Sequence, residues 1–256
     1  MEPAADPPNS VLGKVVAVLR AFTVEETVLG FAELARRTGL AKATLHRLLA
    51  EMVSTGLLDR SDGRYRLSGL VFELGMRASV ERSLLEVATP FLEELLERTQ
   101  ETVHLGIREG AEVVYIAKMG GDRQAESPSR LGGRMPVHAT AIGKVLLAHA
   151  DEDARAAVLA APLGRRAPRT VVHVDVLRRQ LEVARERNLA FEHEESAVGI
   201  TCVAAAIRED GDLARAAVSV TGPVHRFAPD RQATAVRAAA DGIAATLGRR
   251  ADARRS

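Results

Sequence analysis

The residues with the clearest chemical potential in this sequence are the basic side chains between residues 30 and 67. This stretch holds seven basic and four acidic residues, a net charge of +3, whereas the whole chain of 256 residues carries +1. Its basic residues are Arg36, Arg37, Lys42, Arg47, Arg60, Arg64 and Arg66. Because guanidinium and ammonium groups neutralise phosphates, and arginine also pairs with guanine edges, the stretch predicts a nucleic-acid-binding surface.

The pattern around these side chains predicts three short helices followed by a hairpin. Apolar residues recur with a helical period over 11–22, 31–38 and 42–55, and two strand-like runs follow at 57–60 and 64–67. Gly39 and Gly56 follow the second and third helices, as expected for left-handed helix ends. Asp62-Gly63 between the strands is a strong hairpin-turn signal. Residues 11–68 are therefore predicted to form a winged helix-turn-helix domain.

The third helix is predicted to enter the major groove of DNA. Its apolar stripe is Leu45, Leu48, Leu49 and Met52, and its other side presents Lys42, Ala43, Thr44, His46 and Arg47. Small residues beside Thr44 and Arg47 let the helix lie deep in the groove, where Arg47 pairs with a guanine edge or a phosphate. Arg60, Arg64 and Arg66 are expected on the wing, following the backbone or entering the minor groove. The alternative is a small protein-interaction module.

The rest of the chain is predicted to form a connecting helix and a second domain. We expect flexible tails at 1–10 and 249–256, a linker helix at 69–82 and a sensor domain at 83–248. Expected helices of the sensor domain are 84–97, 140–150, 151–160, 175–188 and 229–247; expected strands are 101–108, 112–118, 190–195, 201–208 and 213–221. Strands mixed with helices, including an antiparallel hairpin, predict an α+β fold rather than a doubly wound sheet.

Composition and missing motifs exclude several functional classes. Apolar residues make up 46% and charged residues 27%, a globular balance. No apolar run is long enough to span a bilayer, the N-terminus lacks a secretory signal pattern, and the single Cys202 fits a reducing cytoplasm. A nucleophile elbow, a phosphate-binding loop and a His-x-x-His motif are all missing. We therefore expect neither an enzyme nor a cofactor nor a metal site.

Five ordered motifs resemble the IclR family of transcriptional regulators. They are FAELARRTGLAKATLHRLL at 31–49 with DGRYRL at 62–67, ETVHL at 101–105, PVHATAIGKVLLA at 136–148, EESAVGITCVAA at 194–205 and SVTGP at 219–223. The resemblance covers about residues 11–248. It implies a winged helix, a linker helix and a GAF-like effector domain, in dimers that can pair into tetramers. It also implies repression or activation of operator DNA under the control of a small metabolite.

The resemblance also implies positions for the effector site. These are Ala141, Ile142, Glu192, Cys202, Ser219 and Thr221. A helix N-terminus beside two hydroxyls suits a carboxylate, so an organic acid is one expected effector. Bulky Ile142 narrows such a site and Glu192 repels a second carboxylate, so a more polar, partly neutral ligand is equally compatible. Cys202 is expected in the core or the pocket wall, and a sensor that acts through protein partners without operator DNA is the alternative function.

Overall fold

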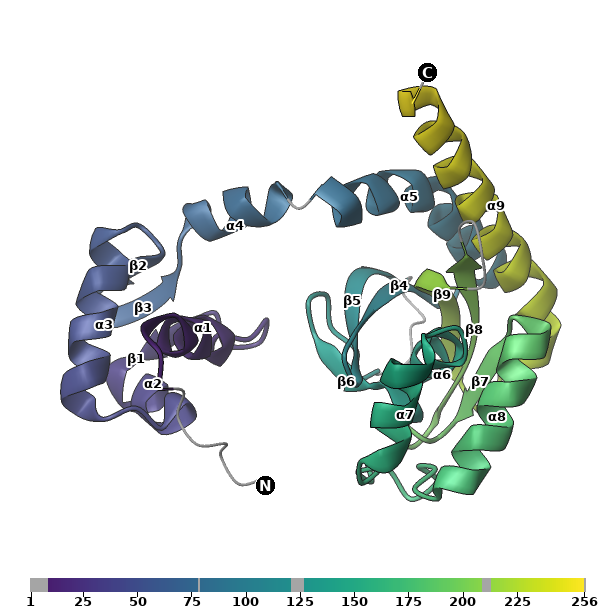
Figure 1. The fold of residues 1–256 in the computed structure, drawn as a ribbon, viewed down its shortest axis with the longest axis horizontal. Helices are drawn as coiled ribbons and strands as arrows, with labels where there is room; N and C mark the ends of the chain where they lie inside the picture. Colours follow the sequence, from purple (N-terminus) through teal and green to yellow (C-terminus); the bar gives the residue numbers. More distant parts are fainter. Residues whose placement is uncertain (1–8, 78, 121–126, 209–212, 256) are drawn as a thin grey trace. The chain divides into compact units, whose positions relative to one another are not determined.

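The computed structural model describes residues 9–77, 79–120, 127–208 and 213–255, and the chain divides into two compact units, Met1–Arg82 and Ser83–Ser256 (Figure 1). Most of the expected N-terminal tail lies outside the described residues, and so do residues 121–126 and 209–212.

The first unit contains four helices and a small antiparallel sheet among its described residues. They are α1 (Val11–Ala21), β1 (Val28–Gly30), α2 (Phe31–Thr38), α3 (Lys42–Ser54), β2 (Leu58–Ser61), β3 (Arg64–Leu67) and α4 (Gly69–Met76). The sheet order is β1-β3-β2. Ser61 pairs with Arg64, and Asp62 and Gly63 both have positive φ angles, 50° and 74°, so the Asp-Gly turn is confirmed. Strand β1 is an element that the sequence reasoning did not predict.

The core of the first unit forms on the predicted stripe of α3. Leu45, Leu48, Leu49 and Met52 are all buried, and they pack with side chains that include Leu34 of α2 and Val18 of α1. Gly39 ends α2 with φ of 64°, a left-handed conformation that costs glycine little. Because α2 stops there, the chain can turn sharply into α3, which leaves the opposite side of α3 exposed.

The expected linker helix at 69–82 is wrong in its bounds. Helix α4 ends at Met76, and a second helix, α5 (Ser79–Thr99), begins inside the expected linker and continues through the helix expected at 84–97. No glycine or proline separates residues 79–83 from the amphipathic stretch that follows, so nothing stops the helix from extending toward its N-terminus.

The second unit is built on one six-stranded antiparallel sheet. Its strands are β4 (Thr102–Glu109), β5 (Glu112–Met119), β6 (Arg134–Pro136), β7 (Ala190–His193), β8 (Ile200–Arg208) and β9 (Ala214–Pro223). They lie in the order β6-β5-β4-β9-β8-β7. Short β6 is, like β1, a strand that the sequence did not predict. The α+β class predicted from the sequence is correct.

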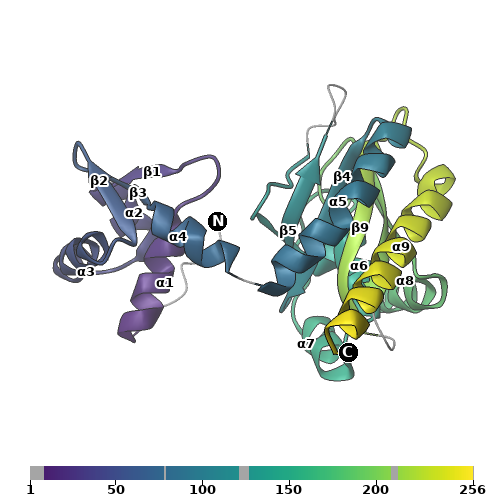
Figure 2. The same ribbon diagram turned by 90° about the horizontal axis from the view of Figure 1, so that it is seen from above.

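Helices cover both faces of this sheet (Figures 1 and 2). One face carries α5 and α9 (Pro229–Arg255); the other carries the 3₁₀ turn η1 (Val137–Ala139), α6 (Ala141–Ala148), α7 (Glu152–Ala160) and α8 (Val174–Arg187). The tail expected at 249–256 is instead helical as far as Arg255, and Arg250 of α9 forms an ion pair with Glu86 of α5. None of the helices in the described ranges is both long and apolar enough to cross a bilayer.

Candidate functional site

The exposed side of α3 carries the predicted DNA-contacting residues. Lys42, Ala43, His46 and Arg47 are exposed, and Thr44 is half-buried. Within the described part of the chain, Lys42 and Arg47 form no ion pair. Their charges are therefore not neutralised locally and remain available to an anionic partner.

Two other basic residues of the predicted surface are engaged within the unit. Arg36 forms an ion pair with Glu33, and Arg37 binds both Glu33 and Glu26 and donates to the carbonyl oxygen of Ala21 at 2.8 Å. The hydrogen bonds that Arg36 and Arg37 donate to Glu33 lower the pKa of its carboxyl group to about 2, so the carboxylate stays ionised at neutral pH. Arg36 and Arg37 thus stabilise α2 and its surroundings, and the net positive surface concentrates on α3 and the wing.

The three wing arginines are all exposed, but their contacts differ. The Arg60 guanidinium lies 5.4 Å from the centre of the Tyr65 ring, Arg64 donates to the Val28 carbonyl at 3.0 Å, and Arg66 pairs with Asp59 at 2.9 Å. Arg66 therefore carries the least uncompensated charge of the three.

The six residues expected to bind an effector lie together in the second unit. Ala141, Ile142, Glu192, Cys202, Ser219 and Thr221 all line one cavity between α6 and the sheet, here called the α6 cavity. The strand register explains part of this arrangement, because Glu192 pairs with Cys202, and Cys202 pairs with Thr221. Cross-strand partners present their side chains on the same face of a sheet. Residues far apart in the sequence therefore meet under α6.

The α6 cavity is small and nearly filled by its own side chains. Its volume is about 20 Å³, and one water needs roughly 10–15 Å³ on such a measure. Ile142 contributes to this tightness, because its side chain lies against Gly106 of β4, where an added methyl group would come within 3.1 Å of Cγ2. Polar groups on opposite walls are therefore separated by little more than the space of a water molecule.

Six further polar residues line the cavity, and the sequence reasoning did not assign them to it. They are His104, Tyr115, Ser127, Ser129, Thr140 and Ser196. His104 Nε2 lies 2.8 Å from Ser129 Oγ, and its Nδ1 lies 3.4 Å from Ser219 Oγ and 3.5 Å from Thr221 Oγ1. Two signals were available for His104, because it lies in the ETVHL motif and follows the same alternation as Thr102 on β4. Tyr115 and Ser129 carried none, because strand pairing brings them in from β5 and from the segment before β6.

Burial keeps the titratable groups of the cavity neutral or nearly so. It lowers the pKa of His104 to about 3, with a smaller contribution from Lys118, so the ring is neutral at pH 7. Burial also raises the pKa of Cys202 to about 12, helped by Glu192. The Cys202 sulfur lies 3.0 Å from Thr221 Oγ1 and stays a protonated thiol. Burial raises the pKa of Glu192 to about 7, which makes it the group nearest to titrating under physiological conditions.

The N-terminus of α6 adds backbone donors to the cavity. Thr140 caps the helix, accepting a hydrogen bond from Gly143 N at 3.0 Å, and Lys144 N bonds to the Thr140 carbonyl. The amides of Ala141 and Ile142 precede that first helical bond, so the helix offers them no acceptor. Gly143 is required here because its Cα packs directly on the backbone of Val137, leaving no room for a side chain.

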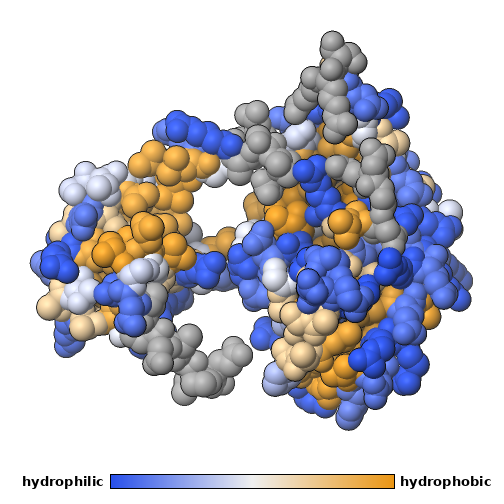
Figure 3. Space-filling view, in the orientation of Figure 1, coloured by the Kyte–Doolittle hydropathy of each residue, from blue (hydrophilic) through white to orange (hydrophobic). Residues whose placement is uncertain are grey.

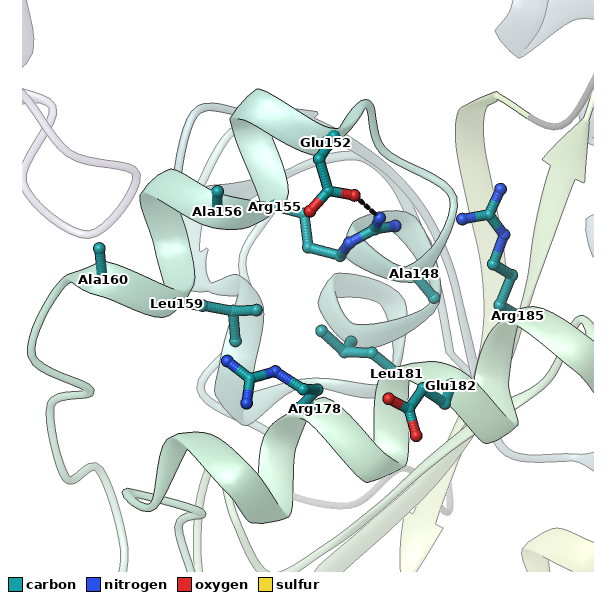
Figure 4. Close-up of a pocket in the computed structure, with 10 residues that line it drawn as sticks. All are labelled: Ala148, Glu152, Arg155, Ala156, Leu159, Ala160, Arg178, Leu181, Glu182 and Arg185. Atoms are coloured by element: carbon teal, nitrogen blue, oxygen red, sulfur yellow. Dashed lines mark hydrogen bonds and ion pairs between the residues drawn. The ribbon is translucent and has the colours of Figure 1, made fainter.

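A larger groove lies between α7 and α8, with a volume of about 520 Å³, but none of the predicted effector residues line it (Figure 4). Leu159 and Leu181 lie between the two helices, and Arg155 is paired with Glu152 beside them. Arg178 is likewise paired, with Asp175 at 3.2 Å. The groove therefore combines apolar side chains with Arg155 and Arg178, whose charges are compensated by neighbouring carboxylates.

His138 and His104 serve as hydrogen-bonding residues, with His138 Nε2 2.8 Å from the Gly164 carbonyl oxygen. Across the residues that the structure describes, no cluster of three or more His, Cys, Asp and Glu side chains is arranged to hold a metal ion.

Two family models match this chain and together cover most of it. The model described as "IclR helix-turn-helix domain" matches residues 11–62, and the model described as "Bacterial transcriptional regulator IclR C-terminal" matches residues 76–245.

Individual proteins agree with these family matches. The chain is 34% identical to the HTH-type transcriptional regulator KdgR of Escherichia coli K12, covering 88% of this chain and 86% of that protein. It is 31% identical to the HTH-type transcriptional repressor AllR of the same organism, covering 98% and 94%. An IclR homolog from Microbacterium hydrocarbonoxydans, solved in complex with 4-hydroxybenzoate, superimposes with a TM-score of 0.86 at 34% identity, covering 93% of this chain and 99% of that one.

The matched regions are the winged helix-turn-helix and the domain that holds the α6 cavity. The chain therefore belongs to the IclR family of bacterial transcriptional regulators, with a DNA-binding helix-turn-helix domain and a ligand-binding C-terminal domain.

Proposed function

We propose that this regulator binds a small organic acid in the α6 cavity and that binding changes its affinity for operator DNA. The proposal rests on one observation: the N-terminus of α6 and the hydroxyl groups of Ser219 and Thr221 line the same buried cavity. Unpaired backbone N–H groups at a helix N-terminus favour an anion. The related protein solved with 4-hydroxybenzoate supports the same ligand class.

The size of the cavity suggests how binding is coupled to a conformational change. A volume of about 20 Å³ accommodates no organic acid, so binding requires Ile142 or other lining side chains to move. A ligand shifts a conformational equilibrium only if it binds one state better than the other. The tight cavity is the state of low affinity for the acid, and an expanded cavity is the state that the acid stabilises.

The proposed mode of action is binding, without catalysis. Cys202 is a buried thiol whose raised pKa, about 12, keeps it protonated and so a poor nucleophile. A regulator that acts on operator DNA works in the cytoplasm of a bacterium, and that is the location we propose.

The proposed DNA contacts are Lys42, Ala43, Thr44, His46 and Arg47 on α3 and Arg60, Arg64 and Arg66 on the wing. Support comes from the exposure of this side of α3 and from the unpaired charges of Lys42 and Arg47 among the described residues. Arg47 is expected to read a base edge, whereas Arg64 is expected to contact the phosphate backbone.

The experiment that tests this proposal measures DNA binding by fluorescence anisotropy, with a labelled fragment from upstream of the regulator's own gene and a scrambled fragment. Arg47→Ala is expected to weaken specific binding by about 1–3 kcal/mol and to leave the scrambled fragment almost unaffected. Arg64→Ala is expected to weaken both and to reduce the salt dependence. Arg36→Ala, on α2, is the matched control that changes neither. Failure of the wild type to prefer any upstream fragment would favour a sensor that acts through protein partners.

A further inference from the structure

The carboxyl group of Glu192 is unusual among the groups that line the α6 cavity, because its two oxygens have different surroundings. The residue is only 2% exposed. Oε1 accepts hydrogen bonds from Glu195 N at 2.6 Å, Ser196 N at 3.0 Å and Ser196 Oγ at 3.2 Å. Within the described residues Oε2 receives no hydrogen bond. A proton on this carboxyl therefore belongs on Oε2, since Oε1 is already occupied by three donors.

The charged and titratable groups around Glu192 give it little compensation. Lys144 of α6 lies nearby, but it is bound to Glu195 of the β7–β8 loop at 2.5 Å, and that carboxylate opposes ionisation of Glu192. Cys202 of β8 and Tyr115 of β5 face Glu192 as neutral groups, and His104 of β4 lines the same cavity as a neutral ring. No lysine or arginine lines the cavity among the described residues.

An acid anion entering this cavity would place a second negative charge close to the first. Two carboxylates in one desolvated site cannot both stay ionised without a large electrostatic cost, and such pairs share a proton. The Tyr115 hydroxyl, which also forms no hydrogen bond with the described residues, and the α6 amides supply donors but no positive charge. An anion therefore binds in the cavity without this electrostatic cost only if Glu192 is neutral.

We propose that the α6 cavity binds its anionic effector together with one proton, carried on Oε2 of Glu192, which then donates a hydrogen bond to the effector. The inference rests on the proposed function, because it concerns the same cavity and ligand class. The proton comes from the solvent, one O–H bond forms on Glu192, and no covalent bond to the effector is made or broken. Effector affinity then falls as the pH rises above the pKa of Glu192, and the response on DNA becomes sensitive to pH.

Calorimetry with three acids of graded size, acetate, benzoate and 4-hydroxybenzoate, tests this inference at pH 6, 7 and 8. Titration in buffers of different ionisation enthalpy gives the number of protons taken up. For the wild type we expect uptake approaching one proton at pH 8 and a loss of affinity that approaches tenfold per pH unit above the pKa. Glu192→Gln keeps a neutral donor at the Oε2 position, so its uptake is expected to be near zero and its affinity independent of pH.

Glu194→Gln is the matched control, because Glu194 follows β7 closely, in the β7–β8 loop, but accepts a hydrogen bond from Gly199 N and pairs with Arg169 outside the cavity. It is expected to keep the pH dependence of the wild type. A pH-independent affinity in the wild type, or a dependence that survives in Glu192→Gln, would overturn the inference. Failure of all three acids to bind at pH 6 would overturn the anionic ligand class and the inference with it.

A ligand-free readout separates this inference from the proposed function. In protein labelled with ¹³C at glutamate Cδ, the resonance absent from Glu192→Gln is expected to titrate near pH 7, and titration near pH 4 would contradict the inference. Operator binding measured on the same samples without acid reports on the DNA-binding function alone.

Discussion

The side-chain nitrogen of Lys144 on α6 lies 2.5 Å from Oε1 of Glu195 in the β7–β8 loop, and the two side chains are only 1% and 7% exposed. Lys144 Nζ also lies 3.3 Å from the Phe191 carbonyl oxygen. The backbone N–H of the same residue, Glu195, donates a hydrogen bond to Glu192 in the wall of the α6 cavity. This buried ion pair therefore connects α6 to the loop whose amides donate hydrogen bonds to Glu192.

Removing one partner of this pair is expected to be costly. Lys144→Met leaves the Glu195 carboxylate buried and uncompensated, so the free energy of unfolding should fall by about 3–5 kcal/mol in urea titrations at pH 7. Lys144→Met combined with Glu195→Gln removes the orphaned charge and should recover most of that loss. Equal destabilisation by the single and double variants would show that the pair contributes packing and not charge compensation.

Glu192 gives a pH dependence of stability whose sign follows from its pKa. The folded-state pKa of about 7 lies above the ordinary value of 4.5, so the native state retains a proton that the unfolded state has lost between these pH values. Glu192 therefore adds to the free energy of unfolding, and this stabilisation is fully present below pH 4.5. It is lost as the pH rises toward 7, by about 3 kcal/mol in total.

Glu192→Gln removes this titration and tests its size. As the pH rises from 4.5 to 8, the free energy of unfolding of the variant should increase relative to that of the wild type. Urea unfolding at each pH measures both values. Comparing the two proteins cancels other titrating groups, including His104, whose lowered pKa acts in the opposite direction. A difference that stays constant across this range would contradict the raised pKa.

Ile142 is expected to limit the size of the effector. Ile142→Ala enlarges the α6 cavity, so 4-hydroxybenzoate should bind about tenfold or more tightly relative to acetate than it does in the wild type. The variant should lose about 2–5 kcal/mol of stability, as large-to-small core substitutions do. Ile243→Ala, buried on α9 on the other face of the sheet, is the control for stability without a change in ligand preference. An unchanged preference in Ile142→Ala would place the size limit elsewhere.

Assembly into dimers is expected to use apolar side chains of the first unit. Leu12 of α1 and Phe72 of α4 are 78% and 72% exposed, and Figure 3 shows apolar surface over these helices. Two-fold pairing also places two recognition helices on one operator. Phe72→Glu should therefore shift the protein toward monomer in light scattering at micromolar concentration and weaken operator binding. Val198→Glu, at an exposed valine of the second unit, is the control. A wild type that is monomeric and binds its operator fully would contradict this.

The sequence predicted those elements whose ends are marked by residues with a strong local conformational preference. Helix α2 ends where Gly39 adopts the left-handed conformation, and the wing turns at Asp62-Gly63. Three-residue β1 and β6 escaped prediction because so short a strand has no visible alternation and exists only through its pairing with β3 and β5. The boundary between α4 and α5 was also missed, because Gly75 lies inside α4 and no glycine or proline follows it until Pro90, well inside α5.

The cavity could be predicted only in part for a related reason. The family resemblance pointed to residues on α6, β7, β8 and β9. His104, although it lies in the ETVHL motif, joins them only through its register with Ser219, across 115 positions of sequence. Glu195 meets Lys144 across 51 positions, and no local pattern marks that pairing. Long-range contacts of this kind depend on the folded sheet. The sequence shows each of the two residues but not that they are in contact.

The most direct test of the central claim measures operator affinity by fluorescence anisotropy with and without a bound acid, in the wild type and in the Ser219→Ala, Thr221→Ala double variant. In the wild type the acid should change operator affinity, and operator DNA should change acid affinity by the same factor, typically about 5- to 150-fold. The double variant should bind operator normally yet lose the response, because the ligand's polar groups are left unpaired. A full response in a folded double variant would contradict the account, because the effector would then bind outside the α6 cavity.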